Sequence, residues 1–231
     1  MNKDNDHILG SFQTALDELN VSLFQMADLV RLNLDKAVEG LIKRDTNLCT
    51  AVIADDEDIN NLEKRIDEEG LRIITLYQPV ASDLRLVASM MKVSPNLERI
   101  GDQSVGIAKR ARKMNKNEEI SETLLVDPLY KMAADLLRQS LEAFKNRNVE
   151  QAISVKKQDA ELNVIHKELV KKLTKRMESD PERIKDYLDL QFIARALERV
   201  GDYSKNICED AIFVESAVDI RHGGVLSHED N

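Results

Sequence analysis

Residues 97–102 read LERIGD, and one hundred positions later residues 197–202 read LERVGD. The likeness continues beyond these two segments at three pairs of positions: Ser104 and Ser204, Ile107 and Ile207, and Ala111 and Ala211. Repetition over this length indicates that the chain contains two copies of one supersecondary unit. We therefore expect two similar halves, a first of residues 1–117 and a second of residues 118–231.

The composition of the chain is typical of long helices. Its 231 residues are enough to bury a substantial core, and they include no Trp and only eight Gly. Charged residues make up 32% of the chain, and Leu, Ala, Glu, Lys and Arg lose little entropy when they enter a helix. Because residues that interrupt helices are so few, the sequence predicts an all-α protein.

Hydrophobic periodicity places six long helices along the chain. Apolar residues recur every three or four positions from Phe12 to Leu41, as they do on one face of a helix. Asp45 is a suitable N-cap for a second helix, and Asp180-Pro181 is a strong start signal for the last one. The six predicted helices cover about residues 5–43, 45–76, 82–113, 122–146, 149–179 and 181–218.

The predicted architecture is two tandem up-and-down three-helix bundles joined by short turns. Pro95 lies inside the third predicted helix, where proline removes a backbone hydrogen bond. The matching residue in the second half is Arg195, with no helix stop nearby, so we expect Pro95 to kink a continuous helix. Polar residues and two Gly follow Asp219, which predicts a short C-terminal tail that frays.

Charge and targeting signals narrow the class of function. A net charge of −9 argues against nucleic acid, which needs a basic surface, and against unaided binding of an inorganic anion. It favours metal cations or basic patches on partner proteins. The chain shows neither a signal-peptide pattern nor a run of about twenty apolar residues, so we expect a soluble cytoplasmic protein. Cys49 and Cys208 lack CxxC spacing and are expected to be buried free thiols.

The repeated motif carries an unusual pair of charges. Glu98 and Asp102 are four positions apart, as are Glu198 and Asp202, so each pair lies on one face of a helix. Like charges at this spacing repel by roughly 0.2–0.5 kcal/mol. Two carboxylates so placed can present oxygens to one divalent or trivalent cation. The alternative interpretation is that they pair with arginines such as Arg99.

The preceding helix of each half offers further oxygen ligands. Three residues share one face at offsets of 0, 4 and 7 in both halves: Asp56, Asn60 and Glu63 in the first, and Asp159, Asn163 and His166 in the second. The histidines His7, His222 and His228 have no partners at metal-ligand spacing and are expected to be plain surface residues. Gly101 and Gly201 interrupt the motif helices at a cost of about 1 kcal/mol each, which favours close helix packing there.

Catalytic signatures are missing from the sequence. There is no GxSxG elbow, no Cys–His signature, no Gly-rich phosphate loop and no ExxH pair of the ferritin-like type. We therefore expect a protein that is not an enzyme. Two alternatives stay open, namely a helical-bundle di-metal carboxylate enzyme and a metal-free helical adaptor whose carboxylates pair with arginines.

Several segments together resemble the PhoU family of phosphate-transport regulators. They are residues 79–86 (PVASDLRL), both LER motifs, residues 206–208 (NIC) and residues 219–222 (DIRH). The resemblance spans nearly the whole chain and implies an acidic helical regulator that restrains phosphate uptake and the phosphate-starvation response. It also implies two partners, the ATPase subunit of the phosphate ABC transporter and a phosphate-sensing histidine kinase, with assembly as a homodimer and only peripheral association with the membrane.

The resemblance also implies a set of metal ligands. The family's E/DxxxD motif binds clusters of iron or zinc, and also of manganese, magnesium or nickel, and it corresponds here to Glu98, Asp102, Glu198 and Asp202. Family members place an acidic residue on the preceding helix with Asp or Asn four positions later. The matching pairs here are Asp56 with Asn60 and Asp159 with Asn163. Both later residues are Asn, a neutral and weaker ligand than Asp.

Overall fold

The computed structural model describes the backbone of residues 3–218 and the side chains of residues 10–218. This part of the chain folds into α-helices and two short 3-10 helices, η1 (Ser121–Val126) and η2 (Pro181–Arg183), with no β-strand. The α-helices are α1 (Lys3–Ile42), α2 (Thr46–Ala54), α3 (Asp56–Tyr77), α4 (Ala81–Met114), α5 (Asp127–Lys145), α6 (Val149–Ser179) and α7 (Ile184–Ser216). The predicted all-α fold of two tandem three-helix bundles is confirmed.

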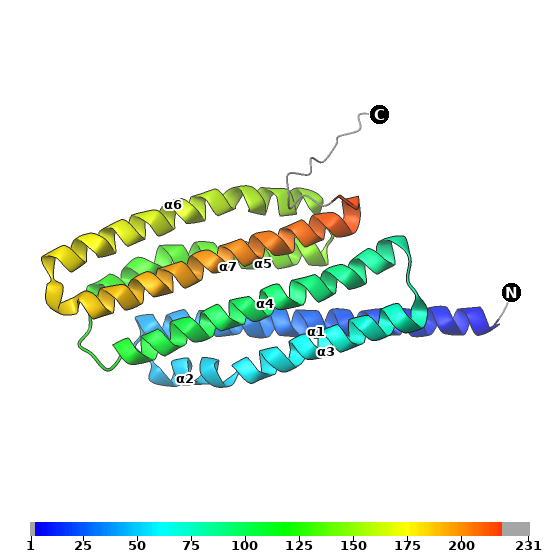
Figure 1. The fold of residues 1–231 in the computed structure, drawn as a ribbon, viewed down its shortest axis with the longest axis horizontal. Coiled ribbons are helices and arrows are strands. Elements are labelled where there is room, and N and C mark those ends of the chain that lie inside the picture. Colours follow the sequence, from blue (N-terminus) through cyan, green and yellow to red (C-terminus); the bar gives the residue numbers. More distant parts are fainter. Residues whose placement is uncertain (1–2, 219–231) are drawn as a thin grey trace, which may run out of the picture.

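The two bundles lie side by side and share one layer of helices. Figure 1 shows α6, α7, α4 and α3 following one another across the molecule, with α5 and α1 behind them. Helices α4 and α7 pack along each other in opposite directions. A hydrogen bond links them, in which the Asn206 amide donates to the Asn96 amide oxygen at 3.0 Å. The division of the chain between residues 117 and 118 falls in the connection between α4 and η1, and it stays a prediction.

The second predicted helix is interrupted at Asp55, which is a correction to the sequence prediction. Asp45 caps α2 as expected, since its carboxylate accepts from the backbone N–H groups of Asn47 and Leu48 at 2.8 and 3.3 Å. The chain then ends α2 and starts α3 within one residue. The first turn of α3 is acidic, and carboxylates stabilise the positive end of a helix dipole. Lys36 on α1 also donates to the Asp55 carboxylate at 3.1 Å and holds the junction in place.

Two other helices, α5 and α7, begin later in the sequence than predicted, because a 3-10 turn precedes each of them. Residues 121–126 and 181–183 form 3-10 turns, so α5 begins at Asp127 and α7 at Ile184. Pro128 occupies the first turn of α5, where its missing N–H leaves no intrahelical bond unmade. Helix α4 runs without a break through Pro95, as predicted.

The core forms around α1 and the two central helices, α4 and α7. Leu19, Met26 and Leu34 on α1 have no exposed surface, and Cys49 and Cys208 are buried free thiols, as predicted. No helix of the described chain is long and apolar enough to cross a membrane. The predicted tail and the side chains of the three terminal histidines lie outside the described residues.

Candidate metal centres

Two glycines set the distance between the helices that carry the predicted ligands. A Cβ atom on Gly101 of α4 would lie 3.0 Å from Cδ1 of Ile59 on α3. A Cβ atom on Gly201 of α7 would lie 2.1 Å from Cδ2 of Leu162 on α6 and 3.5 Å from Oδ1 of Asp159. The predicted close packing at both glycines is confirmed. Each motif helix is therefore pressed against the helix that bears the second set of polar residues.

The first centre is the group of residues Asp56, Asn60 and Glu63 on α3 with Glu98 and Asp102 on α4. Its carboxylates are close enough to perturb one another. Burial raises the pKa of Glu98, and the charges of Asp102, Glu63 and Asp56 raise it further. Burial and the charge of Asp102 also raise the pKa of Asp56. Negative charge is therefore concentrated between α3 and α4, where it favours a proton or another cation.

Side-chain cations do not neutralise the first centre. Within the described residues, none of its four carboxylates makes an ion pair or a hydrogen bond. The Arg99 guanidinium lies 6.0 Å from the ring centroid of Tyr203, and its charge only partly opposes the rise in the pKa of Glu63 and Glu98 that burial causes. The alternative in which arginines pair directly with these carboxylates is therefore not what the first half adopts.

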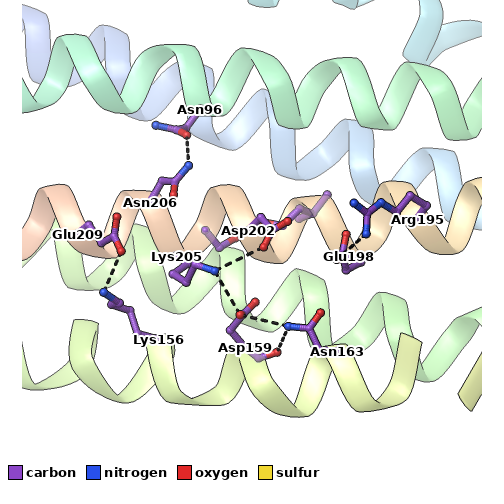
Figure 2. A network of polar contacts seen from close by, with 12 residues as sticks. Asn96, Lys156, Asp159, Asn163, Arg195, Glu198, Asp202, Lys205, Asn206 and Glu209 are labelled. Atoms are coloured by element: carbon purple, nitrogen blue, oxygen red, sulfur yellow. Dashed lines mark hydrogen bonds and ion pairs between the residues drawn. The ribbon is translucent and has the colours of Figure 1, made fainter. Parts of the chain in front are cut away.

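The second centre is the group of residues Asp159, Asn163 and His166 on α6 with Glu198 and Asp202 on α7. Figure 2 shows that this centre contains cations of its own. The Lys205 ammonium lies 3.4 Å from Oδ2 of Asp159 and 3.5 Å from Oδ1 of Asp202. Arg195 donates to Oε1 of Glu198 at 2.8 Å. Burial acts to lower the pKa of Lys205, but the charges of Asp159 and Asp202 outweigh it, so this pKa is raised.

Two carboxylate oxygens of the second centre are left without a partner. Oδ1 of Asp159 and Oε2 of Glu198 are buried and accept no hydrogen bond. The Glu198 residue is only 8% exposed. Buried acceptors are normally satisfied by protein, water or an ion, since leaving one bare costs roughly 1–3 kcal/mol. Carboxylate and amide oxygens are the donors that hard and borderline cations prefer, so the residues present fit a metal ion.

Two further predicted ligands, Asn163 and His166 on α6, belong to the second centre. Burial, followed by the charges of Arg195 and Lys167, lowers the pKa of His166, so its imidazole is neutral at pH 7, the form that can bind a metal. The Asn163 amide donates to Oδ2 of Asp159 at 3.3 Å and orients that carboxylate. Among the side chains that the structure describes, no three His, Cys, Asp or Glu residues converge in metal-binding geometry.

Two cations of the second centre, Lys205 and Arg195, were not predicted from the sequence. Lys205 corresponds to Val105 in the first half, just as Arg195 corresponds to Pro95. The signal was present in the sequence as a difference between the two copies. Positions at which the two copies agree indicate the shared ligands, whereas these cations stand at positions at which the copies differ.

Comparison with known protein families and with relatives of known sequence points to one family. The PhoU domain family model matches residues 23–111 and 126–211. The phosphate-specific transport system accessory protein PhoU of Escherichia coli (strain K12) is 33% identical over 222 residues, which cover 95% of this chain and 91% of that protein. The PhoU homolog of Pseudomonas putida is 36% identical over 220 residues, covering 95% and 86% of the two chains.

Solved structures agree in fold. The crystal structure of PhoU from Pseudomonas aeruginosa superposes with a TM-score of 0.84 at 33% identity, covering 88% of this chain and 98% of that one. In the crystal structure of the phosphate transport system regulatory protein PhoU from Streptococcus pneumoniae the TM-score is 0.83 at 30% identity, over 90% of this chain and 99% of that one. With the family model matched in both bundles, this chain belongs to the PhoU family.

Proposed function

We propose that this protein is a non-enzymatic, metal-binding regulator of phosphate uptake and phosphate homeostasis. Its relatives are named as accessory or regulatory proteins of phosphate transport and match it over most of their length. Desolvation raises the pKa of the buried Cys208 thiol to about 12, which keeps this thiol protonated and a poor nucleophile. A role through binding suits this chemistry better than a role through catalysis.

The observation that best supports metal binding is that the motif carboxylates carry negative charge that the protein's own side chains do not fully neutralise. In the first centre burial and the neighbouring carboxylates raise the pKa of Glu98, and neither Glu98 nor Asp102 has an ion-pair partner in the described structure. In the second centre Glu198 keeps a buried, unpartnered oxygen. A bound cation would neutralise this charge and give an acidic surface an open coordination position for a phosphate or carboxylate. Glu98, Asp102, Glu198 and Asp202 would be the main ligands, with Asp56, Asn60, Asp159 and Asn163 beside them. The resemblance to the family favours iron or zinc as the bound ion, and oxygen ligands of this kind are also compatible with manganese, magnesium or nickel.

The proposed partners are the ATPase subunit of the phosphate ABC transporter and the phosphate-sensing histidine kinase, met at the cytoplasmic face of the membrane by a homodimer. A net charge of −9 suits basic docking patches on such partners. The names of the relatives support a place beside the transport system, and the choice between the two partners is part of the proposal.

Elemental analysis of the purified full chain tests the metal-binding part. A variant with Glu98→Gln, Asp102→Asn, Glu198→Gln and Asp202→Asn is compared with a charge-matched control in which exposed carboxylates change: Asp58→Asn, Glu68→Gln, Glu161→Gln and Glu168→Gln. We expect metal in the wild type and the control and none in the motif variant. Equal metal content in the motif variant and the control would refute the assignment of ligands.

Regulation is tested in a bacterium that lacks its own PhoU protein. The wild-type chain and the control should restore low phosphate uptake in phosphate-rich medium, and the motif variant should not. If all three repress uptake equally, regulation is independent of metal and the metal-free adaptor becomes the better description.

A further inference from the structure

We infer that the two centres are unequal, because Lys205 supplies an internal cation to the second centre and competes there with a metal ion. The first centre then takes up a divalent cation readily, and the second does so only when the Lys205 side chain withdraws. This inference rests on the proposed metal binding and adds to it a residue that determines which centre is loaded.

The contacts of Lys205 place its charge where a metal would have to bind. Its ammonium lies 3.4 Å from a carboxylate oxygen on α6 and 3.5 Å from one on α7, so it bridges Asp159 and Asp202 across the two helices. These are two of the predicted metal ligands. Since a cation bound between α6 and α7 would need the same oxygens, lysine and metal cannot both hold them, and like charges at such distances repel strongly in a partly buried site.

The first half has no lysine at the position equivalent to Lys205. Val105, which corresponds to Lys205, is apolar and 5% exposed, so it offers no charge to Asp56 or Asp102. Lys109 is close enough to lower the pKa of Asp56, but its ammonium makes no ion pair in the described structure. The two centres therefore use residues at equivalent sequence positions and differ in the cations beside them.

Lys205 partners only some of the carboxylate oxygens of the second centre, so a metal ion can compete with it for this site. Oδ1 of Asp159 and Oε2 of Glu198 remain without partners while the ammonium bridge is formed. The Lys205 side chain keeps 32% of its surface exposed, so it can extend into solvent on its flexible stem when a doubly charged ion arrives. A metal ion would gain the unsatisfied oxygens as well as those that Lys205 gives up.

Manganese binding to the chelator-stripped full chain tests this inference, because free Mn²⁺ is counted directly by electron paramagnetic resonance. The background variant is Glu98→Gln with Asp102→Asn, which disables the first centre. Lys205→Met is added to this background, and Lys156→Met serves as the matched control. Lys156 also joins α6 to α7 by an ion pair, at 2.8 Å from Glu209, but it lies outside the second centre. Circular dichroism checks that all variants are folded.

We expect the wild type to show one tight class of Mn²⁺ sites that the background variant loses. Adding Lys205→Met should raise the affinity of the remaining sites about tenfold or more, while Lys156→Met should leave it unchanged. The inference is overturned if the background variant keeps the tight class, or if Lys205→Met and Lys156→Met behave alike. These outcomes leave metal binding itself intact. Absence of binding in every protein, wild type included, would instead refute the proposed function.

Discussion

Substituting Gly201 by Ala tests how closely the second pair of helices must approach. In an open helix, this change stabilises by about 0.8–1 kcal/mol, because glycine has more freedom to lose. Here the new Cβ would lie 2.1 Å from Cδ2 of Leu162, whereas carbon atoms pack best at about 3.5–4.0 Å. The Leu162 methyl group would have to move by more than about 1 Å, yet Leu162 has no exposed surface and no solvent to move into.

Overpacking of a buried site costs about 1–3 kcal/mol, which exceeds the gain in helix propensity. We therefore expect Gly201→Ala to lower the free energy of unfolding by up to about 2 kcal/mol, and by less if rotation of Leu162 relieves the contact. Gly106 on α4 is the control, since the nearest atom to its Cβ would be Nη1 of Arg110 at an ordinary 3.8 Å. Gly106→Ala should stabilise by about 0.5–1 kcal/mol.

Urea unfolding followed by circular dichroism measures both changes from the transition midpoints, at a shared slope. Gly101→Ala should fall between the two variants, because its Cβ would lie 3.0 Å from Cδ1 of Ile59. The reasoning is refuted if Gly201→Ala is as stable as Gly106→Ala, since the contact with Leu162 would then not limit helix approach.

Three further outcomes follow from the structure. Glu98→Gln should stabilise the metal-free protein by about 0.2–0.5 kcal/mol for each like-charge contact removed, as measured by urea unfolding near pH 7. The pKa of Glu98 is raised in the folded protein, so its ionised carboxylate lowers stability at a pH above that pKa. Below the pKa that Glu98 has in the unfolded chain, the carboxyl is protonated in both states and this cost disappears. The stabilisation by Glu98→Gln should therefore vanish as the pH falls towards about 4. Asn206→Ala removes the hydrogen bond to Asn96 between the bundles and should lower the unfolding midpoint in thermal scans, by an amount corresponding to about 0.5–1 kcal/mol. Cys49 and Cys208, buried with raised thiol pKa, should react with a thiol reagent only as the chain unfolds, and rapid labelling of the native protein would contradict their burial.

Most of the fold was predictable because local signals and burial agree along the helices. The apolar stripe from Phe12 to Leu41 predicts α1 since it is the face that packs on the rest of the bundle. The break at Asp55 was not predictable from periodicity, because the apolar pattern continues through it. It depends on an acidic first turn and on a contact with Lys36, which is distant in sequence.

The candidate centres were predictable in their location but not in their charge balance. Helical spacing places Glu98 and Asp102 on one face, and the glycine between them indicates that another helix lies close. Pairing across helices is different, because Lys205 reaches Asp159 over 46 residues of sequence. No spacing rule within one helix relates those two residues, so only the folded arrangement shows that the ammonium occupies the centre.

The two copies agree in the residues that fix the backbone and differ in those that set the charge. Ser104 and Ser204 are both buried and donate to the carbonyl four residues earlier, at 3.0 and 2.7 Å, and each lies three residues after a glycine that admits the neighbouring helix. These shared contacts accompany close packing of each motif helix against its neighbour. The charge beside them is not constrained by the same packing, because Lys205 is partly exposed and Val105 makes no polar contact in the described structure. The two halves therefore share their helix packing and differ in the charge at the equivalent positions 105 and 205.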